Sequence, residues 1–150
     1  MPSTPPAGAL ATACRFSRYL QRLLLARPAL AEEVGAQLDT PVDRATLEAW
    51  LAEEPLTEDN LKPALRRFKQ RAYARIATRD LACSAPLAEV VDSISLVAEL
   101  AVAEALRVLH QGLAARYGEP RAAGGDAQTL IVVGMGKLGG RELNVSSDVD

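Results

Sequence analysis

A long run of apolar residues at helical spacing, from about Pro86 to Arg116, is the strongest constraint on how this chain folds. Spacings of three and four residues place such side chains on one face of an α-helix. The acidic residues of the run fall mostly on the other side, so the pattern predicts one long helix. Its apolar residues are Leu87, Val90, Val91, Ile94, Val97, Ala101, Ala105, Val108 and Leu109.

The residues before this run also predict helices. A helix opened by Thr57 is expected to continue to about Ile76, because its apolar positions step by 4, 3, 4 and 4 residues. Proline suits the first turn of a helix, and threonine can cap one, so both residues mark helix starts. Shorter helices are therefore predicted over residues 10–27, from Pro28 to Leu38, and from Thr40-Pro41 to about Glu54.

The charges are segregated along the chain, although the net charge is only -2. Residues 32–60 carry nine acids and one base, and residues 61–80 carry seven bases and one acid. We expect the two blocks to pair with each other; the alternative is that the basic helix meets a phosphate or an acidic partner surface. The near-neutral charge and the 4% aromatic content argue against partners of nucleic acid or anionic membrane.

The chain has two cysteines, Cys14 and Cys83, which form no CxxC pair and suggest a reducing compartment. No apolar run reaches the roughly 18 residues of a membrane span, and no export signal precedes Arg15. We therefore expect a cytoplasmic protein that does not associate with membranes.

The pattern changes after Tyr117, where a Gly- and Ala-rich stretch predicts a linker over residues 118–128. Thr129–Val133 is a short β-branched apolar run bounded by glycine, which predicts a buried strand. The expected fold is mainly α, with a helical N-terminal region followed by the first strand or strands of a truncated α/β domain. The expected divisions are a disordered tail at 1–9, a helical region at 10–117, the linker, and the start of a catalytic domain at 129–150.

The glycines after this run match two phosphate-binding patterns only in part. Gly134, Gly136 and Gly139 fit G-x-G-x-x-G, the dinucleotide fingerprint of nicotinamide-dependent oxidoreductases. That fold requires a helix that opens at the glycines, and the residues that follow are poor helix formers. A P-loop is excluded because Lys137 is followed by leucine instead of serine or threonine.

A third interpretation fits better, namely a phosphate-binding loop followed by metal ligands. A Gly-rich loop can present backbone N–H groups and a lysine to phosphates. Asp148 and Asp150, two residues apart on a strand, would place both carboxylates on one face. Hard cations such as Mg²⁺ prefer carboxylate and phosphate oxygens, so the pair could bind divalent cations for an in-line displacement at phosphorus.

The segment Gly134-Met-Gly-Lys-Leu-Gly-Gly-Arg-Glu-Leu-Asn-Val-Ser-Ser-Asp-Val-Asp150 resembles the active-site signature of the bifunctional glutamine synthetase adenylyltransferase/adenylyl-removing enzymes. That family belongs to the DNA polymerase β-like nucleotidyltransferases. A weaker resemblance extends upstream over the basic helix to about residue 15. The Glu-Leu-Asn-x-Ser-Ser-Asp form, after just over a hundred helical residues, is similar to the N-terminal, adenylyl-removing half.

The resemblance assigns Asp148 and Asp150 as catalytic and metal-binding residues, with Mg²⁺ as the cofactor. Many relatives in the superfamily have Gly-Ser where this chain has Gly136-Lys137, so Lys137 or backbone amides would contact phosphate in place of the serine. The remaining nucleotide- or phosphate-binding candidates, which would shape the loop, are Gly139, Gly140 and Ser147.

The implied reaction is attack of inorganic phosphate on the AMP–tyrosine bond of adenylylated glutamine synthetase, which releases ADP and free tyrosine. The other half of such an enzyme would transfer AMP from ATP under the control of PII-type signalling proteins. The superfamily uses a third carboxylate on a later strand, so we expect residues 1–150 to be a fragment that is inactive alone. A helical protein-interaction module remains the non-enzymatic alternative.

Overall fold

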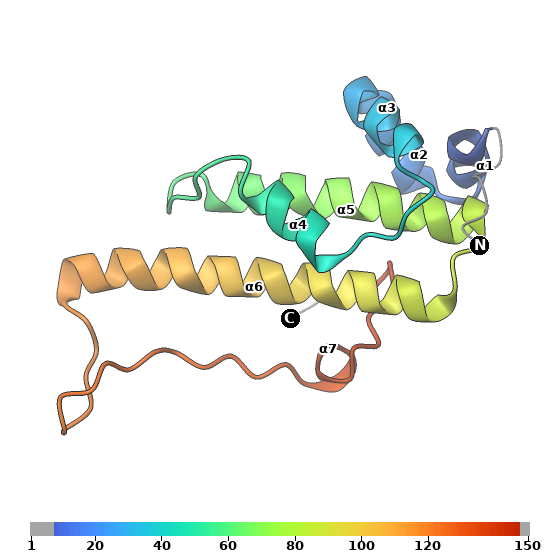
Figure 1. The fold of residues 1–150 in the computed structure, drawn as a ribbon. Helices are drawn as coiled ribbons and strands as arrows, with labels where there is room; N and C mark the ends of the chain where they lie inside the picture. Colours follow the sequence, from blue (N-terminus) through green and yellow to red (C-terminus); the bar gives the residue numbers. More distant parts are fainter. Residues whose placement is uncertain (1–7, 148–150) are drawn as a thin grey trace.

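The computed structural model describes residues 8–147, which form seven α-helices, two of them long (Figure 1). The predicted disordered tail, at 1–9, lies almost entirely outside the described residues. The helices are α1 Ala9–Phe16, α2 Arg18–Ala26, α3 Pro28–Ala36, α4 Arg44–Leu51, α5 Leu61–Cys83, α6 Leu87–Tyr117 and α7 Gly136–Gly139.

The two long helices, α5 and α6, lie side by side and form the centre of the structure (Figure 1). The turn between them includes Ser84 in a left-handed conformation, with φ 53°, and Ala85, whose N–H donates to the carbonyl of Arg79. The long helix predicted from Pro86 to Arg116 is thus confirmed as α6. The apolar cluster between α4, α5 and α6 consists of Val42, Leu47, Phe68, Ala72, Ile76, Val90, Leu96, Val97 and Leu100.

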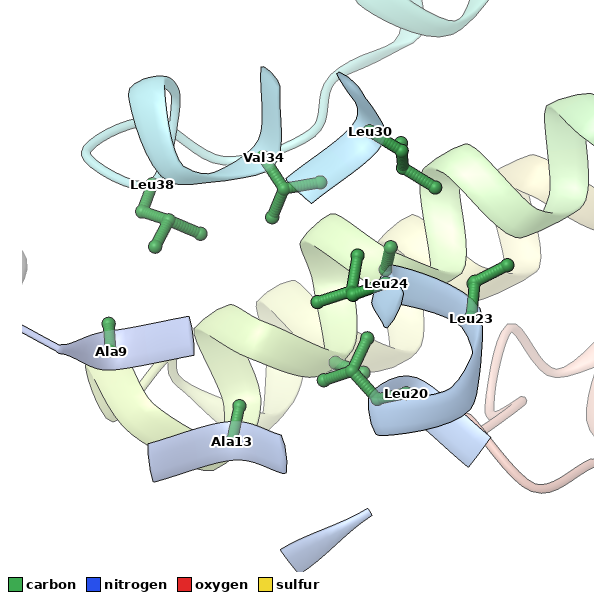
Figure 2. Packing of buried hydrophobic residues seen from close by; sticks show 10 residues of the cluster. Ala9, Ala13, Leu20, Leu23, Leu24, Leu30, Val34 and Leu38 are labelled. Carbon is green, nitrogen blue, oxygen red and sulfur yellow. The ribbon is translucent and has the colours of Figure 1, made fainter. Parts of the chain in front are cut away.

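A second apolar cluster joins α1, α2 and α3 to another face of α5 (Figure 2). Ala9 and Ala13 of α1 belong to the same cluster as Ala74 and Ala77 of α5, and these small side chains let the two backbones approach closely. Leucines and valine from α2, α3 and the residues after them complete the cluster. They are Leu20, Leu23, Leu24, Leu30, Val34 and Leu38.

The starts of α2 and α5 differ from the sequence prediction because nearby side chains form hydrogen bonds with the backbone. Ser17 divides the predicted 10–27 helix: it is extended, and its hydroxyl accepts a hydrogen bond from the N–H of Leu20 at 3.2 Å, which starts α2. Thr57 does not open α5. Instead, the Asn60 side chain accepts from the N–H of Thr57 at 2.8 Å, and the two residues form a separate turn before Leu61.

The helix predicted to start at Thr40-Pro41 starts at Arg44 instead. The guanidinium of Arg75, which is buried, donates to the hydroxyl and carbonyl oxygens of Thr40 at 2.7 and 3.0 Å, so this segment stays outside the helix. Asp43 is the cap, and its carboxylate accepts from the N–H of Thr46 at 2.8 Å. Hydrogen bonds from Thr46 lower the pKa of Asp43. The stability that this cap contributes is therefore lost as pH falls through the lowered pKa.

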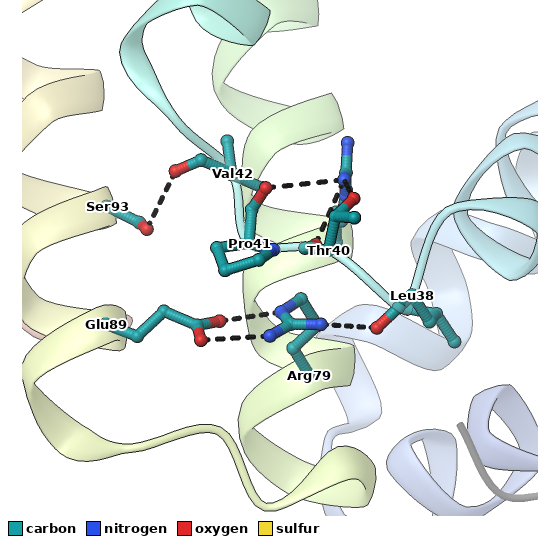
Figure 3. A network of polar contacts seen from close by, with 8 residues as sticks. Leu38, Thr40, Pro41, Val42, Arg79, Glu89 and Ser93 are labelled. Atoms are coloured by element: carbon teal, nitrogen blue, oxygen red, sulfur yellow. Dashed lines mark hydrogen bonds and ion pairs between the residues drawn. The ribbon is translucent and has the colours of Figure 1, made fainter. Parts of the chain in front are cut away.

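Arg79 links three parts of the chain (Figure 3). It forms a bidentate ion pair with Glu89 of α6, with N···O distances of 2.6 and 2.9 Å, and donates to the carbonyl of Leu38. Ser93 of α6 donates to the carbonyl of Val42 nearby at 3.1 Å. These bonds attach the α3–α4 connection to both long helices.

The pairing predicted between the acidic and basic blocks is confirmed. Arg71 contacts Glu33 at 2.6 Å and Glu53 at 2.7 Å, and its guanidinium lies 4.4 Å from the ring centroid of Trp50. Arg67 pairs with Glu54. Acids of the α3–α4 region therefore neutralise one face of the basic helix α5.

The predicted strand at Thr129–Val133 is wrong, and with it the α/β part of the expected fold: residues 8–147 contain no β-strand, only an isolated bridge between Arg121 and Ala127. A strand needs a neighbour for its backbone groups, and the described residues offer none. Ile131 and Val133 are 80% and 75% exposed. The mainly helical part of the prediction is confirmed.

No helix in the described part of the chain is long and apolar enough to cross a membrane.

Replacing Arg79 with alanine should destabilise the fold by about 3 kcal/mol, because it leaves Glu89 and a buried carbonyl without their partner. Urea unfolding measures this loss. Arg107→Ala is the matched control, since its pair with Glu104 is solvent-exposed and contributes less than about 1 kcal/mol. Equal losses in the two variants would contradict the role of the Arg79 network.

Candidate phosphate-binding loop

The Gly-rich loop lies beside α6. After Tyr117 the chain turns back and runs extended to Met135, and α7 follows (Figure 1). A groove of about 350 Å³ separates α6 from this segment. It is lined by Glu99, Val102, Ala103, Leu106, Val132, Gly134, Leu138 and Gly139.

Two glycines of the loop hold positions that disfavour residues with a side chain. Gly136 has φ +56°, in the left-handed region that favours glycine. At Gly139 an added Cβ would collide with the carbonyl of Gly134. Gly140 is less restricted, since its Cβ would lie 3.4 Å from the nearest atom. The glycines therefore permit a tight turn in which the backbone of Gly139 packs directly against that of Gly134.

The backbone hydrogen bonds of the loop leave its first amides available. The later amides, of Gly139, Gly140 and Glu142, donate to the carbonyls of residues 135–137 at 3.3, 2.9 and 2.7 Å. Gly136, Lys137 and Leu138 donate to no backbone carbonyl among residues 8–147, and Lys137 is exposed with no ion-pair partner there. Free amides beside a lysine are donors suited to a phosphate oxygen.

Arg141 attaches the loop to α6. It has φ 56°, unusual for a residue with a side chain, and it pairs with Glu99 at 2.9 Å and Asp92 at 3.4 Å. Leu143, which is buried, donates its N–H to the hydroxyl of Ser95 at 3.4 Å. The sequence interpretation missed these contacts; the seven-residue spacing of the two acids on α6 was the available signal.

A compact turn follows at Asn144–Ser147. The Asn144 side chain accepts from the N–H of Ser146 at 3.0 Å and from the Ser147 hydroxyl at 3.1 Å. The N–H of Ser147 donates to the carbonyl of Asn144 at 3.0 Å. Ser147 thus orders the turn that immediately precedes Asp148 in the sequence.

The predicted metal ligands, Asp148 and Asp150, lie outside the described residues. Within residues 8–147 no group of three His, Cys, Asp or Glu side chains could hold a metal ion. A larger cavity, of about 500 Å³, opens between α3, α4 and α5, and none of the residues that line it belongs to the loop. The structure therefore brings the glycines and Lys137 into one loop and leaves the metal assignment to the sequence.

The family model described as glutamate-ammonia ligase adenylyltransferase matches residues 7–150. The chain belongs to this family. An oxidoreductase fingerprint would open a longer helix at the glycines, whereas α7 has four residues.

Curated relatives agree with this assignment. A protein of Burkholderia mallei is 50% identical over 141 residues, which cover 90% of this chain and 15% of the relative. A protein of Aromatoleum aromaticum is 43% identical over 99% of this chain and 16% of its own length. A third protein, of Chromobacterium violaceum, is 46% identical over 100% of this chain and 17% of its own length.

All three relatives are named bifunctional glutamine synthetase adenylyltransferase/adenylyl-removing enzyme. The chain spans about one sixth of their length.

Replacing Gly139 with alanine should open the loop, because the new Cβ meets the carbonyl of Gly134. We expect faster amide hydrogen exchange at residues 139–142, whose N–H groups the turn now occupies. Gly140→Ala, which makes only a 3.4 Å contact, is the control and should exchange at the wild-type rate. Unchanged exchange in Gly139→Ala would contradict this account of the loop.

Proposed function

We propose that this chain forms part of a nucleotidyltransferase that acts on glutamine synthetase. The support is the family membership, together with the names of relatives that share 43–50% of their aligned residues with it. The loop carries the donors that a phosphoryl substrate requires: three amides without backbone partners and the exposed Lys137.

The finer proposal is that these residues belong to the adenylyl-removing half. The Glu-Leu-Asn-x-Ser-Ser-Asp form of the motif at residues 142–148 supports it, as does the helical region before the loop. In the reaction, a phosphate oxygen attacks the phosphorus of the AMP–tyrosine bond. The bond to the tyrosine oxygen breaks, and the products are ADP and free tyrosine.

The described residues would bind and orient the phosphates. Lys137 would balance their negative charge, and the amides of Gly136–Leu138 would donate to their oxygens. Gly139, Gly140 and Ser147 hold the loop and the turn that leads to the aspartates.

Mg²⁺ would be held by Asp148 and Asp150, and its carboxylate donors are the ones this cation prefers. When bound, the metal supplies further positive charge at the reacting phosphate. We extend the proposal to ATP, ADP and phosphate as ligands, to PII-type signalling proteins as regulators, and to the cytoplasm as location.

Substitution of Asp148 or Asp150 with asparagine should abolish phosphorolysis in the full-length protein, meaning a chain of the relatives' length that carries these residues. Loss of a metal ligand should lower the rate of ADP release by more than about 100-fold, while the thermal melting curve stays unchanged. Asp126→Asn, on an exposed turn, is the matched control. Wild-type rates in either variant would refute the metal assignment.

Residues 1–150 alone should not phosphorolyse adenylylated glutamine synthetase with Mg²⁺, because the superfamily signature implies a third carboxylate further along the chain. The measurement is ADP release by the purified 150-residue chain, with the full-length protein as the positive control. Turnover by the short chain would show that it contains a complete site.

A further inference from the structure

Only one side of the basic helix α5 is neutralised by the acidic block. Lys62, Arg66 and Lys69 lie on a different face from Arg67 and Arg71, are exposed, and have no carboxylate within 4.0 Å among residues 8–147. The internal pairing of the charge blocks therefore leaves these three bases unexplained.

Helix α2 extends this positive surface. Residues 8–31 contain four arginines and no acid. Arg18 and Arg22 are exposed and, within the described part of the chain, form no ion pair. We call Arg18, Arg22, Lys62, Arg66 and Lys69 the cationic face.

A pair of tyrosines joins the two rows of the cationic face. Tyr19 of α2 meets Tyr73 of α5 edge to face, with ring centroids 4.9 Å apart. Tyr73 continues the stripe of Lys62, Arg66 and Lys69 at steps of 4, 3 and 4 residues, so it shares their side of α5. On α2, Arg22 follows Tyr19 by three residues and lies beside it.

The cationic face and the segment before the predicted metal ligands share an apolar cluster. Tyr73 packs against the cluster of α1, α2, α3 and α5, and so does Val145. Val145 also packs against the α4–α5–α6 cluster, which places it between the two. It precedes Asp148 by three residues in the sequence, so Tyr73, beside the cationic face, and the segment before Asp148 are anchored on one cluster.

The layout suits a broad acidic surface better than a single phosphate or a nucleic acid. The stripe from Lys62 to Lys69 extends about 10 Å along α5, longer than one phosphate group. The two tyrosines pack edge to face against each other, and the chain has only 4% aromatic residues, so a base-stacking platform is missing from the described residues.

We propose that the cationic face docks an acidic surface of the protein substrate and so brings the modified tyrosine to the loop. This inference rests on the proposed function and identifies where glutamine synthetase would bind. Charges spread over two helices attract such a surface and orient it, and they act mainly on association.

The test is a triple variant of the full-length protein, Arg22→Gln/Arg66→Gln/Lys69→Gln. We expect its KM for adenylylated glutamine synthetase to rise about 10-fold at low salt, with kcat within about 2-fold of wild type. The difference should shrink at about 0.5 M salt, where screening weakens the attraction. Arg107→Gln/Arg116→Gln/Arg121→Gln removes the same charge from exposed positions elsewhere and should leave KM unchanged.

The alternatives give distinct results. An unchanged KM in the Arg22/Arg66/Lys69 variant overturns the docking proposal. A lower melting temperature with unchanged KM identifies the face as an internal contact of the longer chain, and weaker binding of duplex DNA with unchanged KM identifies a nucleic-acid surface; both overturn it.

A wild-type protein that releases no ADP defeats the proposed function itself. In that case, equilibrium binding of adenylylated glutamine synthetase to wild type and variant still decides the docking proposal. An approximately 10-fold weaker binding of the variant supports the proposal, and equal binding rejects it.

Discussion

The buried arginines of α5 are the constraint on which the rest of the helical assembly depends. Burial lowers the pKa of Arg75, because a charged guanidinium loses hydration inside the protein. Such a group is stabilised by acceptors, which both terminal nitrogens of Arg75 find, while its Nε has none among residues 8–147. Arg75 and Arg79 take theirs from Gln37, Thr40 and Leu38, at the end of α3 and in the connection to α4. These bonds hold the connection on α5. Helix α4 begins at Arg44, after the last residues that the arginines contact.

Helix α6 connects the buried arginines of α5 to the candidate site. Glu89 pairs with Arg79, while Asp92 and Glu99, further along the same helix, pair with Arg141. The candidate phosphate-binding loop therefore rests on a helix whose own position is set by α5. This arrangement explains how a short Gly-rich segment without long secondary structure holds a defined turn.

The sequence predicted the long helices well and the boundaries of the short helices less well. A stripe repeated over thirty residues identifies α6, whereas one serine hydroxyl divides α1 from α2 and one arginine keeps Thr40 out of a helix. The strand predicted at Thr129–Val133 was wrong because a strand is a pairing between segments and the described residues provide no partner. The motif predicted the glycines and Lys137 as phosphate-binding candidates. The anchor at Arg141 depends on a contact 42 residues away and was missed.

By itself, the sequence determined the helical class, the segregated charge and the signature that identified the family, because periodicity and motif spacing are properties of neighbouring residues. The tertiary structure decided which charges cancel and which stay exposed. Arg71 finds Glu33 and Glu53, while Arg66 and Lys69 of the same helix face solvent. That difference arises because α3 and α4 cover only one side of α5, and no local pattern specifies the side.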